Sequence, residues 1–142
     1  MTVKVITIDG PTASGKGTVA SRVAQALGFH YLDSGALYRL TAYRALKMGV
    51  ALNDIQEVAL LARQMQPVFK NGEIFLDGEN VTEAIRQEAV GLAASKVAAI
   101  GEVRTALEDV QKRAAQEPGL VADGRDMGSV IFPCAQLKVF LT

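Results

Sequence analysis

The chain has 142 residues, of which 49% are hydrophobic, and its 15 basic side chains balance 15 acidic ones. A formal net charge of zero provides no general field for nucleic acid or an anionic membrane, so we expect neither as a partner. The hydrophobic content indicates one globular domain, no apolar run approaches the roughly 18 residues of a membrane span, and the lone cysteine, Cys134, fits a reducing cytoplasm.

The first 18 residues hold the most informative pattern. An apolar run over residues 3–8 predicts a buried strand, and a helical pattern begins near residue 18. Between them lies the sequence Gly10-Pro11-Thr12-Ala13-Ser14-Gly15-Lys16-Gly17-Thr18. In this context the glycines let backbone N–H groups turn toward an anion, the helix N-terminus adds a partial positive charge, and Lys16 adds a full one. The stretch therefore predicts a loop that binds the phosphates of a nucleotide.

One residue departs from the strict phosphate-loop pattern. Gly17 follows Lys16 where that pattern has Ser or Thr, and the hydroxyl comes one position later at Thr18. Thr18 stays a candidate for Mg²⁺ binding, with direct and water-mediated contact both open. Nucleoside monophosphate kinases also carry Gly-Lys-Gly-Thr, so this departure favours that class among the phosphate-loop proteins.

The next elements follow directly along the chain. A short strand is predicted at 29–32, and after it a helix with Asp33 or Ser34 as its N-cap, ending at Gly49. The following helix is predicted to have Asn53 as its N-cap, in a capping box with a glutamine three residues on.

The middle of the chain changes character. Asn71-Gly72 predicts a type I′ turn and Asp77-Gly78 a second turn, within a small β insert at 67–81. Helical patterns then cover about 83–100 and the stretch from 101 to Pro118. Strands are predicted at 120–123 and 137–141.

Strands that alternate with helices predict an α/β fold, with a mostly parallel sheet covered by helices on both faces. We expect a core of residues 1–66 and 82–142, and the insert at 67–81 as a small outlying lobe. Ligands of such folds bind beyond the carboxyl ends of the strands. The phosphate loop, Ser34 and the stretch 123–126 all follow strands, so we expect them along one edge.

Several charged residues at this edge are candidates for chemistry. Asp123 ends its strand where a carboxylate can hold Mg²⁺ or its waters, and Asp9 is a weaker candidate for the outer shell of the metal. Arg39 and Arg125 are candidates for binding a phosphate, because a guanidinium can contact it with two N–H groups. His30, the single histidine, is interpreted as structural.

Three stretches closely resemble bacterial-type cytidylate kinases. They are Gly10 to Thr18, Asp33-Ser34-Gly35-Ala36-Leu37-Tyr38-Arg39 and Ala122-Asp123-Gly124-Arg125-Asp126-Met127-Gly128. The insert at 67–81 and the stretch Ala93-Ala94-Ser95-Lys96-Val97 are similar as well, and the resemblance runs through the whole chain in order. The phosphate loop alone indicates only a P-loop protein, whereas the other two stretches are much more specific.

This resemblance implies transfer of the γ-phosphoryl group of ATP to CMP or dCMP with Mg²⁺, by a cytoplasmic monomer. Lys16 and the loop amides would hold the ATP phosphates. Ser34, Arg39 and Arg125 would hold the acceptor phosphate.

The resemblance also implies that Ser95, Arg104 and Asp126 face the cytosine. Their chemistry suits that base, because a carboxylate can accept from the N4 amino group while Arg and Ser donate to N3 and O2. Uracil has a carbonyl oxygen in place of the N4 amino group and an N–H in place of the N3 acceptor. The site would therefore reject uracil.

Members of this family continue beyond the point where the chain stops, through a lid with further arginines and a last strand and helix. The chain also ends on an apolar strand with no covering helix after it, so we expect it to be a fragment. A kinase for another monophosphate such as UMP or AMP and a non-catalytic nucleotide-binding fragment stay open as alternatives. A P-loop GTPase is not favoured, because the sequence has no Asn-Lys-x-Asp motif for guanine.

Overall fold

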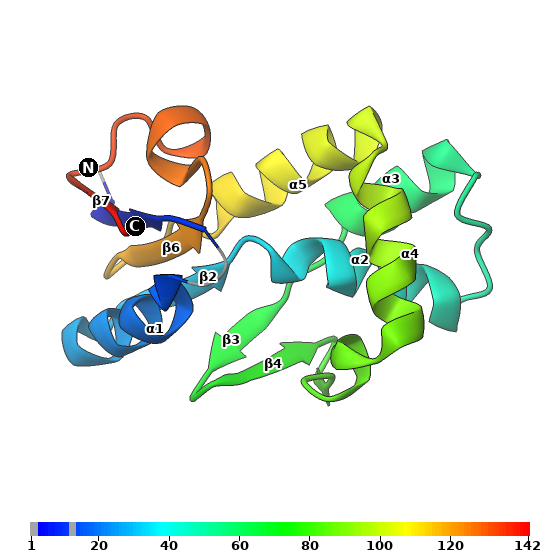
Figure 1. The fold of residues 1–142 in the computed structure, drawn as a ribbon, viewed down its shortest axis with the longest axis horizontal. Coiled ribbons are helices and arrows are strands. Elements are labelled where there is room, and N and C mark those ends of the chain that lie inside the picture. The colour runs from blue at the N-terminus through cyan, green and yellow to red at the C-terminus, as the bar shows by residue number, and fades with distance from the viewer. Residues whose placement is uncertain (1–2, 12–13) are drawn as a thin grey trace. The chain divides into compact units, whose positions relative to one another are not determined.

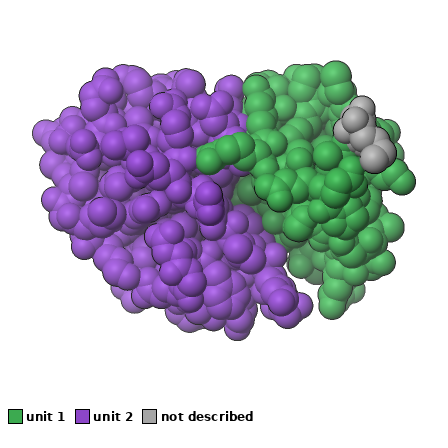
Figure 2. Space-filling view, turned by 180° about the vertical axis from the view of Figure 1, so that it is seen from behind, with its two compact units in different colours: residues 1–34, 111–142 green, residues 35–110 purple. Residues whose placement is uncertain are grey.

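The computed structural model describes residues 3–11 and 14–142. The chain divides into two compact units, Met1–Ser34 with Gln111–Thr142 and Gly35–Val110, coloured separately in Figure 2. Each unit has its own sheet, as the α/β prediction with a small β insert requires.

The first unit is built on a parallel sheet of four strands in the order β2-β6-β1-β7 (Figure 1). The strands are β1 (Val5–Asp9), β2 (His30–Asp33), β6 (Leu120–Gly124) and β7 (Leu137–Phe140). Helix α1 (Lys16–Leu27) packs on this sheet through Ala20 and Ala24, which lie against Ile8 and Val121. These small alanines bring the start of α1 close to the carboxyl ends of the strands, where the phosphate loop lies.

The second unit contains a helical cluster. It comprises α2 (Ala36–Lys47), α3 (Ile55–Arg63), a 3₁₀ turn (Ala84–Arg86), α4 (Glu88–Ala98) and most of α5 (Gly101–Arg113). Helix α2 packs against α3 and α4. Much of the core of this helical cluster is formed by the buried side chains of Leu37, Leu40, Val58 and Val97.

The insert forms a separate antiparallel sheet of β3 (Val68–Lys70), β4 (Glu73–Leu76) and β5 (Glu79–Asn80). Asn71 and Gly72 have φ angles of 55° and 75°, and Asp77 and Gly78 have 53° and 81°. The two predicted turns are therefore confirmed, since a type I′ turn needs a positive φ at both central residues.

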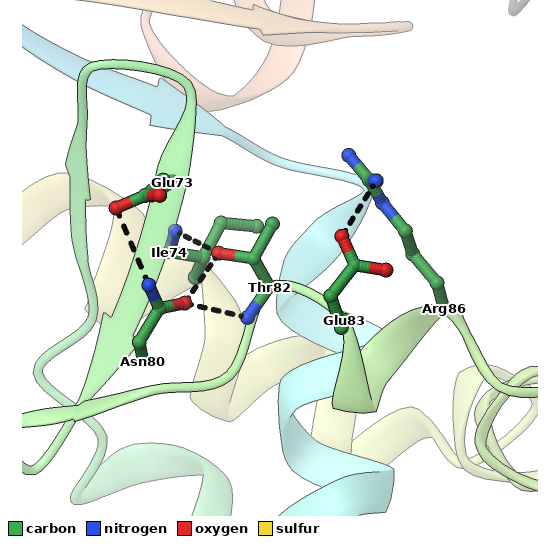
Figure 3. Close-up of polar contacts among 6 residues, drawn as sticks. All are labelled: Glu73, Ile74, Asn80, Thr82, Glu83 and Arg86. Carbon is green, nitrogen blue, oxygen red and sulfur yellow. Dashed lines mark hydrogen bonds and ion pairs between the residues drawn. The ribbon is translucent and has the colours of Figure 1, made fainter.

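Thr82 joins the end of this sheet to its middle strand (Figure 3). Its hydroxyl accepts from the backbone N–H of Ile74 at 2.8 Å and donates to the side chain of Asn80 at 2.7 Å. The amide of Asn80 in turn donates to Glu73 at 3.2 Å. The short strand β5 is thus held by side chains as well as by its ladder.

The predictions of the helix starts are wrong at two places. Gly35 is the N-cap of α2, and no side chain caps that helix, because the hydroxyl of Ser34 bonds elsewhere. Helix α3 is capped by Asp54, which accepts from the N–H of Glu57, rather than by Asn53.

The predicted helix over 83–100 is also not continuous. Gln87 is extended, with φ −65° and ψ 149°, and it separates the 3₁₀ turn from α4.

Over residues 3–11 and 14–142, no helix combines the length and the apolar character needed to cross a bilayer.

Candidate functional site

The phosphate loop follows β1 and ends at the first turn of α1, as predicted. Gly15 is the N-cap of α1 with φ 80°, a conformation that favours glycine. The carbonyl of Pro11 accepts from both the N–H and the hydroxyl of Ser14, at 3.0 and 2.7 Å. Thr12 and Ala13, also predicted to belong to the loop, lie outside the described residues.

Gly10 marks the point where the loop leaves the sheet. A Cβ at this position would lie 2.5 Å from the carbonyl oxygen of Leu141, so only glycine fits there. Its N–H donates to the carbonyl of Gly124 at 3.1 Å. This bond ties the loop to the carboxyl end of β6, where Asp123 lies.

Asp123 and Lys16 meet beside the loop. The carboxylate of Asp123 is buried, with 1% of the residue exposed, and its Oδ1 lies 4.0 Å from Nζ of Lys16. Ser34 belongs to the same edge, because its N–H donates to the carbonyl of Asp123 at 3.0 Å. The structure thus brings the loop, Ser34 and Asp123 together within the first unit, as the parallel sheet predicted.

The second oxygen of Asp123 has a partner that sequence reasoning missed. The hydroxyl of Tyr31 donates to Oδ2 of Asp123. Tyr31 pairs with Val121 in the β2–β6 ladder, so its side chain lies on the same face as that of Asp123 two residues on. A strand register would have been needed to find this pair from the sequence.

The electrostatics of Asp123 follow from this environment. Burial and the negative charge of Asp33, its cross-strand neighbour, raise the pKa of Asp123 to about 6, although the Tyr31 hydrogen bond and Lys16 act in the opposite direction. Burial and the adjacent Asp123 raise the pKa of Tyr31 far above its usual value, so the phenol keeps its proton. A cation bound at Asp123 would offset this burial and repulsion.

Asp9 and Ser34 bind protein groups of the first unit. The two oxygens of Asp9 accept from the backbone N–H groups of Met127 and Gly128 at 2.7 and 2.9 Å, so Asp9 holds the π-helical turn Met127–Ile131. This role differs from the predicted outer shell of a metal. The hydroxyl of Ser34 donates to Gln111, a buried side chain that sequence reasoning also missed, at 2.8 Å. The signal for Gln111 was a polar residue on the buried face of an amphipathic helix.

Three predicted residues of the first unit are exposed. Thr18 lies in the first turn of α1, and Arg125 and Asp126 follow β6 before the turn at Met127. All three are accessible to a ligand at the edge where the loop lies.

The other predicted residues lie in the second unit. Arg39 of α2 donates from Nη1 to the carbonyl of Ile85 at 2.9 Å, and a Cβ on Gly91 would lie 3.3 Å from that nitrogen. Ser95 donates to the carbonyl of Gly91 at 3.3 Å, so Arg39 and Ser95 adjoin the same turn of α4. Arg104 of α5 donates to the carbonyl of Ala98, the last residue of α4, at 2.9 Å.

The residues present fit a magnesium ion bound together with a nucleotide. Over the described residues, no group of three or more His, Cys, Asp or Glu side chains could hold a metal by itself. Mg²⁺ usually binds to one or two carboxylates plus the phosphates of the substrate. Asp123 beside the phosphate loop supplies such a carboxylate, and Thr18 lies in the first turn of the helix that follows the loop.

Comparisons with known proteins identify the family of the chain. The model of the family described as "Cytidylate kinase" matches residues 6–142. Proteins named "Cytidylate kinase" from Polynucleobacter necessarius, Neisseria gonorrhoeae and Nitrosomonas eutropha are 62%, 59% and 57% identical to this chain, over 97%, 98% and 99% of it. The chain spans 64%, 64% and 62% of the lengths of these relatives. The chain belongs to the cytidylate kinase family.

Proposed function

We propose that this protein transfers the γ-phosphoryl group of ATP to CMP or dCMP, giving CDP or dCDP. The observation that carries the proposal is the buried carboxylate of Asp123, 4.0 Å from Lys16 at the phosphate loop. The family membership supplies the acceptor, since the relatives are named for cytidylate.

In this proposal Lys16 and the loop amides hold the phosphates of ATP. Asp123 holds Mg²⁺, directly or through water, with Thr18 as a second candidate, and the metal supplies neutralisation of charge on the transferring group. Arg39 and Arg125, with Ser34, hold the acceptor phosphate.

No protein nucleophile or general base is required. An oxygen of the acceptor phosphate, already ionised at neutral pH, forms a bond to the γ-phosphorus while the bond to the leaving oxygen of ADP breaks. Catalysis then consists of alignment and neutralisation of charge. The residues needed for it are cations and hydrogen-bond donors, which is what the predicted site contains.

Ser95, Arg104 and Asp126 are proposed to select cytosine. In the structure Ser95 and Arg104 donate to carbonyls of α4, and a guanidinium has further N–H groups for a base. The proposed arrangement pairs Asp126 with the N4 amino group and the two donors with N3 and O2. Uracil would place a carbonyl against the carboxylate and an N–H against the guanidinium, which disfavours it strongly.

Calorimetric titration of CMP, dCMP, UMP and AMP into this chain tests the acceptor. We expect CMP and dCMP to bind at least about tenfold more tightly than UMP and AMP, a difference that site hydrogen bonds can supply. Equal binding of all four, or a preference for UMP or AMP, would replace the proposal with the alternative kinases.

Two variants make this test sharper. Arg104→Gln and Asp126→Asn should reduce the preference for CMP over UMP more than they reduce the binding of inorganic phosphate. Arg86→Gln and Asp109→Asn are matched controls, because both residues are exposed and take part in ion pairs of the second unit, with Glu83 and Arg63 (Figure 3 shows the first pair). A loss of preference in the controls would show that the effect is not specific.

The insert at 67–81 is proposed to be a lobe that moves when the acceptor binds, because closure excludes water in phosphoryl transfer. Hydrogen exchange of its amides should slow when CMP is added. Exchange that does not respond to CMP would contradict this movement. A cytoplasmic location and a monomeric state stay predictions.

A further inference from the structure

Tyr31 lies beside the phosphate loop although no part of the loop motif calls for it. Its ring packs against the cluster of Ile8, Ala20, Ala24 and Val121 between α1 and the sheet. Its hydroxyl reaches the carboxyl edge of that sheet and donates to Oδ2 of Asp123. The ring is thus anchored in the core while the hydroxyl enters the candidate nucleotide site.

The two oxygens of Asp123 therefore face different groups. Oδ2 accepts from Tyr31, whereas Oδ1 lies 4.0 Å from Nζ of Lys16, a longer distance than a direct hydrogen bond. Asp33 lies opposite Asp123 in the β2–β6 ladder and repels it. Without a donor at Oδ2, this repulsion and the torsional freedom of the side chain would let the carboxylate turn away.

Gly17 connects this hydrogen bond with the departure from the phosphate-loop pattern. A Cβ built on Gly17 would lie 3.9 Å from the hydroxyl oxygen of Tyr31, at ordinary van der Waals distance. The strict pattern has a Ser or Thr at this position, and its hydroxyl would extend from that Cβ. The hydroxyl of Tyr31 thus comes close to the space that the missing hydroxyl of residue 17 would take.

We propose that Tyr31 is a positioning residue for the metal–nucleotide site, which fixes the carboxylate of Asp123 and compensates for the absence of a hydroxyl at Gly17. The inference rests on the proposed function, because it concerns the binding of ATP with Mg²⁺. Loss of a hydrogen bond to a metal-binding carboxylate lowers metal affinity by roughly 10–100-fold. Tyr31 acts through Asp123 in this account and need not touch the nucleotide.

The test is the gain in ATP affinity on adding Mg²⁺, measured by calorimetry as the ratio of the dissociation constants in EDTA and in Mg²⁺. Tyr31→Phe keeps the ring in the core and removes only the hydroxyl. We expect this ratio to fall by about tenfold or more, while ATP binding in EDTA stays nearly unchanged. If the ratio of the unmutated chain is itself below about ten, we expect it to fall to one. Tyr43→Phe is the matched control, because it removes a hydroxyl that contacts the exposed Glu79 of the second unit.

A rescue distinguishes positioning from a general loss of structure. Gly17→Ser in the Tyr31→Phe background adds a hydroxyl beside the lost one, and no close contact prevents the new Cβ once the phenol oxygen is gone. We expect the double variant to recover most of the Mg²⁺ effect. Failure of the rescue would overturn the role assigned to Gly17.

The outcomes separate the inference from the proposed function. A wild-type chain that binds ATP without any Mg²⁺ effect would contradict the proposed function and the inference with it. A wild-type Mg²⁺ effect that survives Tyr31→Phe, or equal weakening with and without Mg²⁺, would overturn the inference alone.

A second measurement covers the case in which Tyr31→Phe does not fold. In the unmutated chain, the ¹³Cζ resonance of Tyr31 should move when Mg²⁺ is added to the ATP complex, and this response should be absent in Asp123→Asn. A resonance that does not respond to Mg²⁺ would contradict the coupling.

Discussion

Two polar clusters of the molecule contrast with each other. Around Asp123, buried and partly buried groups from distant parts of the chain meet, with Tyr31 and Asp123 separated by 92 positions in sequence. Around Thr82, the partners Ile74 and Asn80 lie eight and two positions away, and the side chains are partly buried or exposed. The first cluster keeps two carboxylates, Asp123 and Asp33, close together where Asp123 is buried. The second cluster only provides hydrogen-bond partners for the groups of a turn.

This contrast indicates which cluster serves function. A raised pKa on a buried acid lowers stability at neutral pH unless a ligand offsets it, so such a group is a candidate for binding. A local network of hydrogen bonds beside a turn stabilises the fold without creating a site. Substitutions in the two clusters should therefore have separable effects.

The largest effect is expected at Lys16. Lys16→Ala removes the cation proposed to hold the ATP phosphates, and we expect kcat for CMP to fall on the order of 10²–10³-fold, as when another preorganised donor to a developing charge is lost. Lys112→Ala, an exposed lysine in the last turn of α5, is the control and should keep full activity. Equal loss in both variants would contradict the role of Lys16.

The next effect is a pH dependence of stability without metal. The pKa of Asp123 is raised to about 6 in the folded chain, so the folded state binds a proton more tightly than the unfolded state does. This contribution is fully present below about pH 4 and is lost as the pH rises through about 6, with a size of at most about 3 kcal/mol. Asp123→Asn should remove this dependence, as followed by denaturation between pH 4 and pH 8 in EDTA. A parallel pH profile in wild type and variant would be evidence against the raised pKa.

A smaller effect is expected in the second cluster. Thr82→Val removes the acceptor of the partly buried N–H of Ile74, and we expect the free energy of unfolding to fall by about 1–2 kcal/mol. Thr82→Ser, which keeps the hydroxyl, should restore most of it. Faster hydrogen exchange at Ile74 in the valine variant alone would locate the effect, and ATP binding should not change.

The smallest effect is expected at the ion pair of Lys47 and Glu79. The two groups lie 2.7 Å apart, but both side chains are about half exposed, so water and salt screen their attraction. Lys47→Ala should therefore leave the melting temperature without a resolvable change. A clear decrease that disappears at high salt would show that the pair matters more than its exposure suggests.

The sequence predicted the parts of the fold that depend on local signals. The phosphate loop and the two turns of the insert each follow from glycines in required conformations. The helix starts were wrong where two polar residues competed for one role. Ser34 bonds to Gln111 instead of capping α2, and Asp54 displaces Asn53 at α3.

The candidate site was predictable only in part, because only some of its residues are marked by local sequence signals. Lys16 and Asp123 are found by motif and strand end, and the parallel sheet brings them together. Tyr31 and Gln111 are not, because their roles depend on the strand register and on the face of a helix. Such pairings across the chain arise from packing, which periodicity alone does not specify.

The measurement that tests the central claim most directly is a coupled phosphotransfer assay of this protein, with Mg²⁺-ATP and CMP, dCMP, UMP or AMP as acceptor. Our account predicts turnover of CMP and dCMP well above that of UMP and AMP, abolished by EDTA. Faster turnover of UMP or AMP, or none with any acceptor, would contradict it.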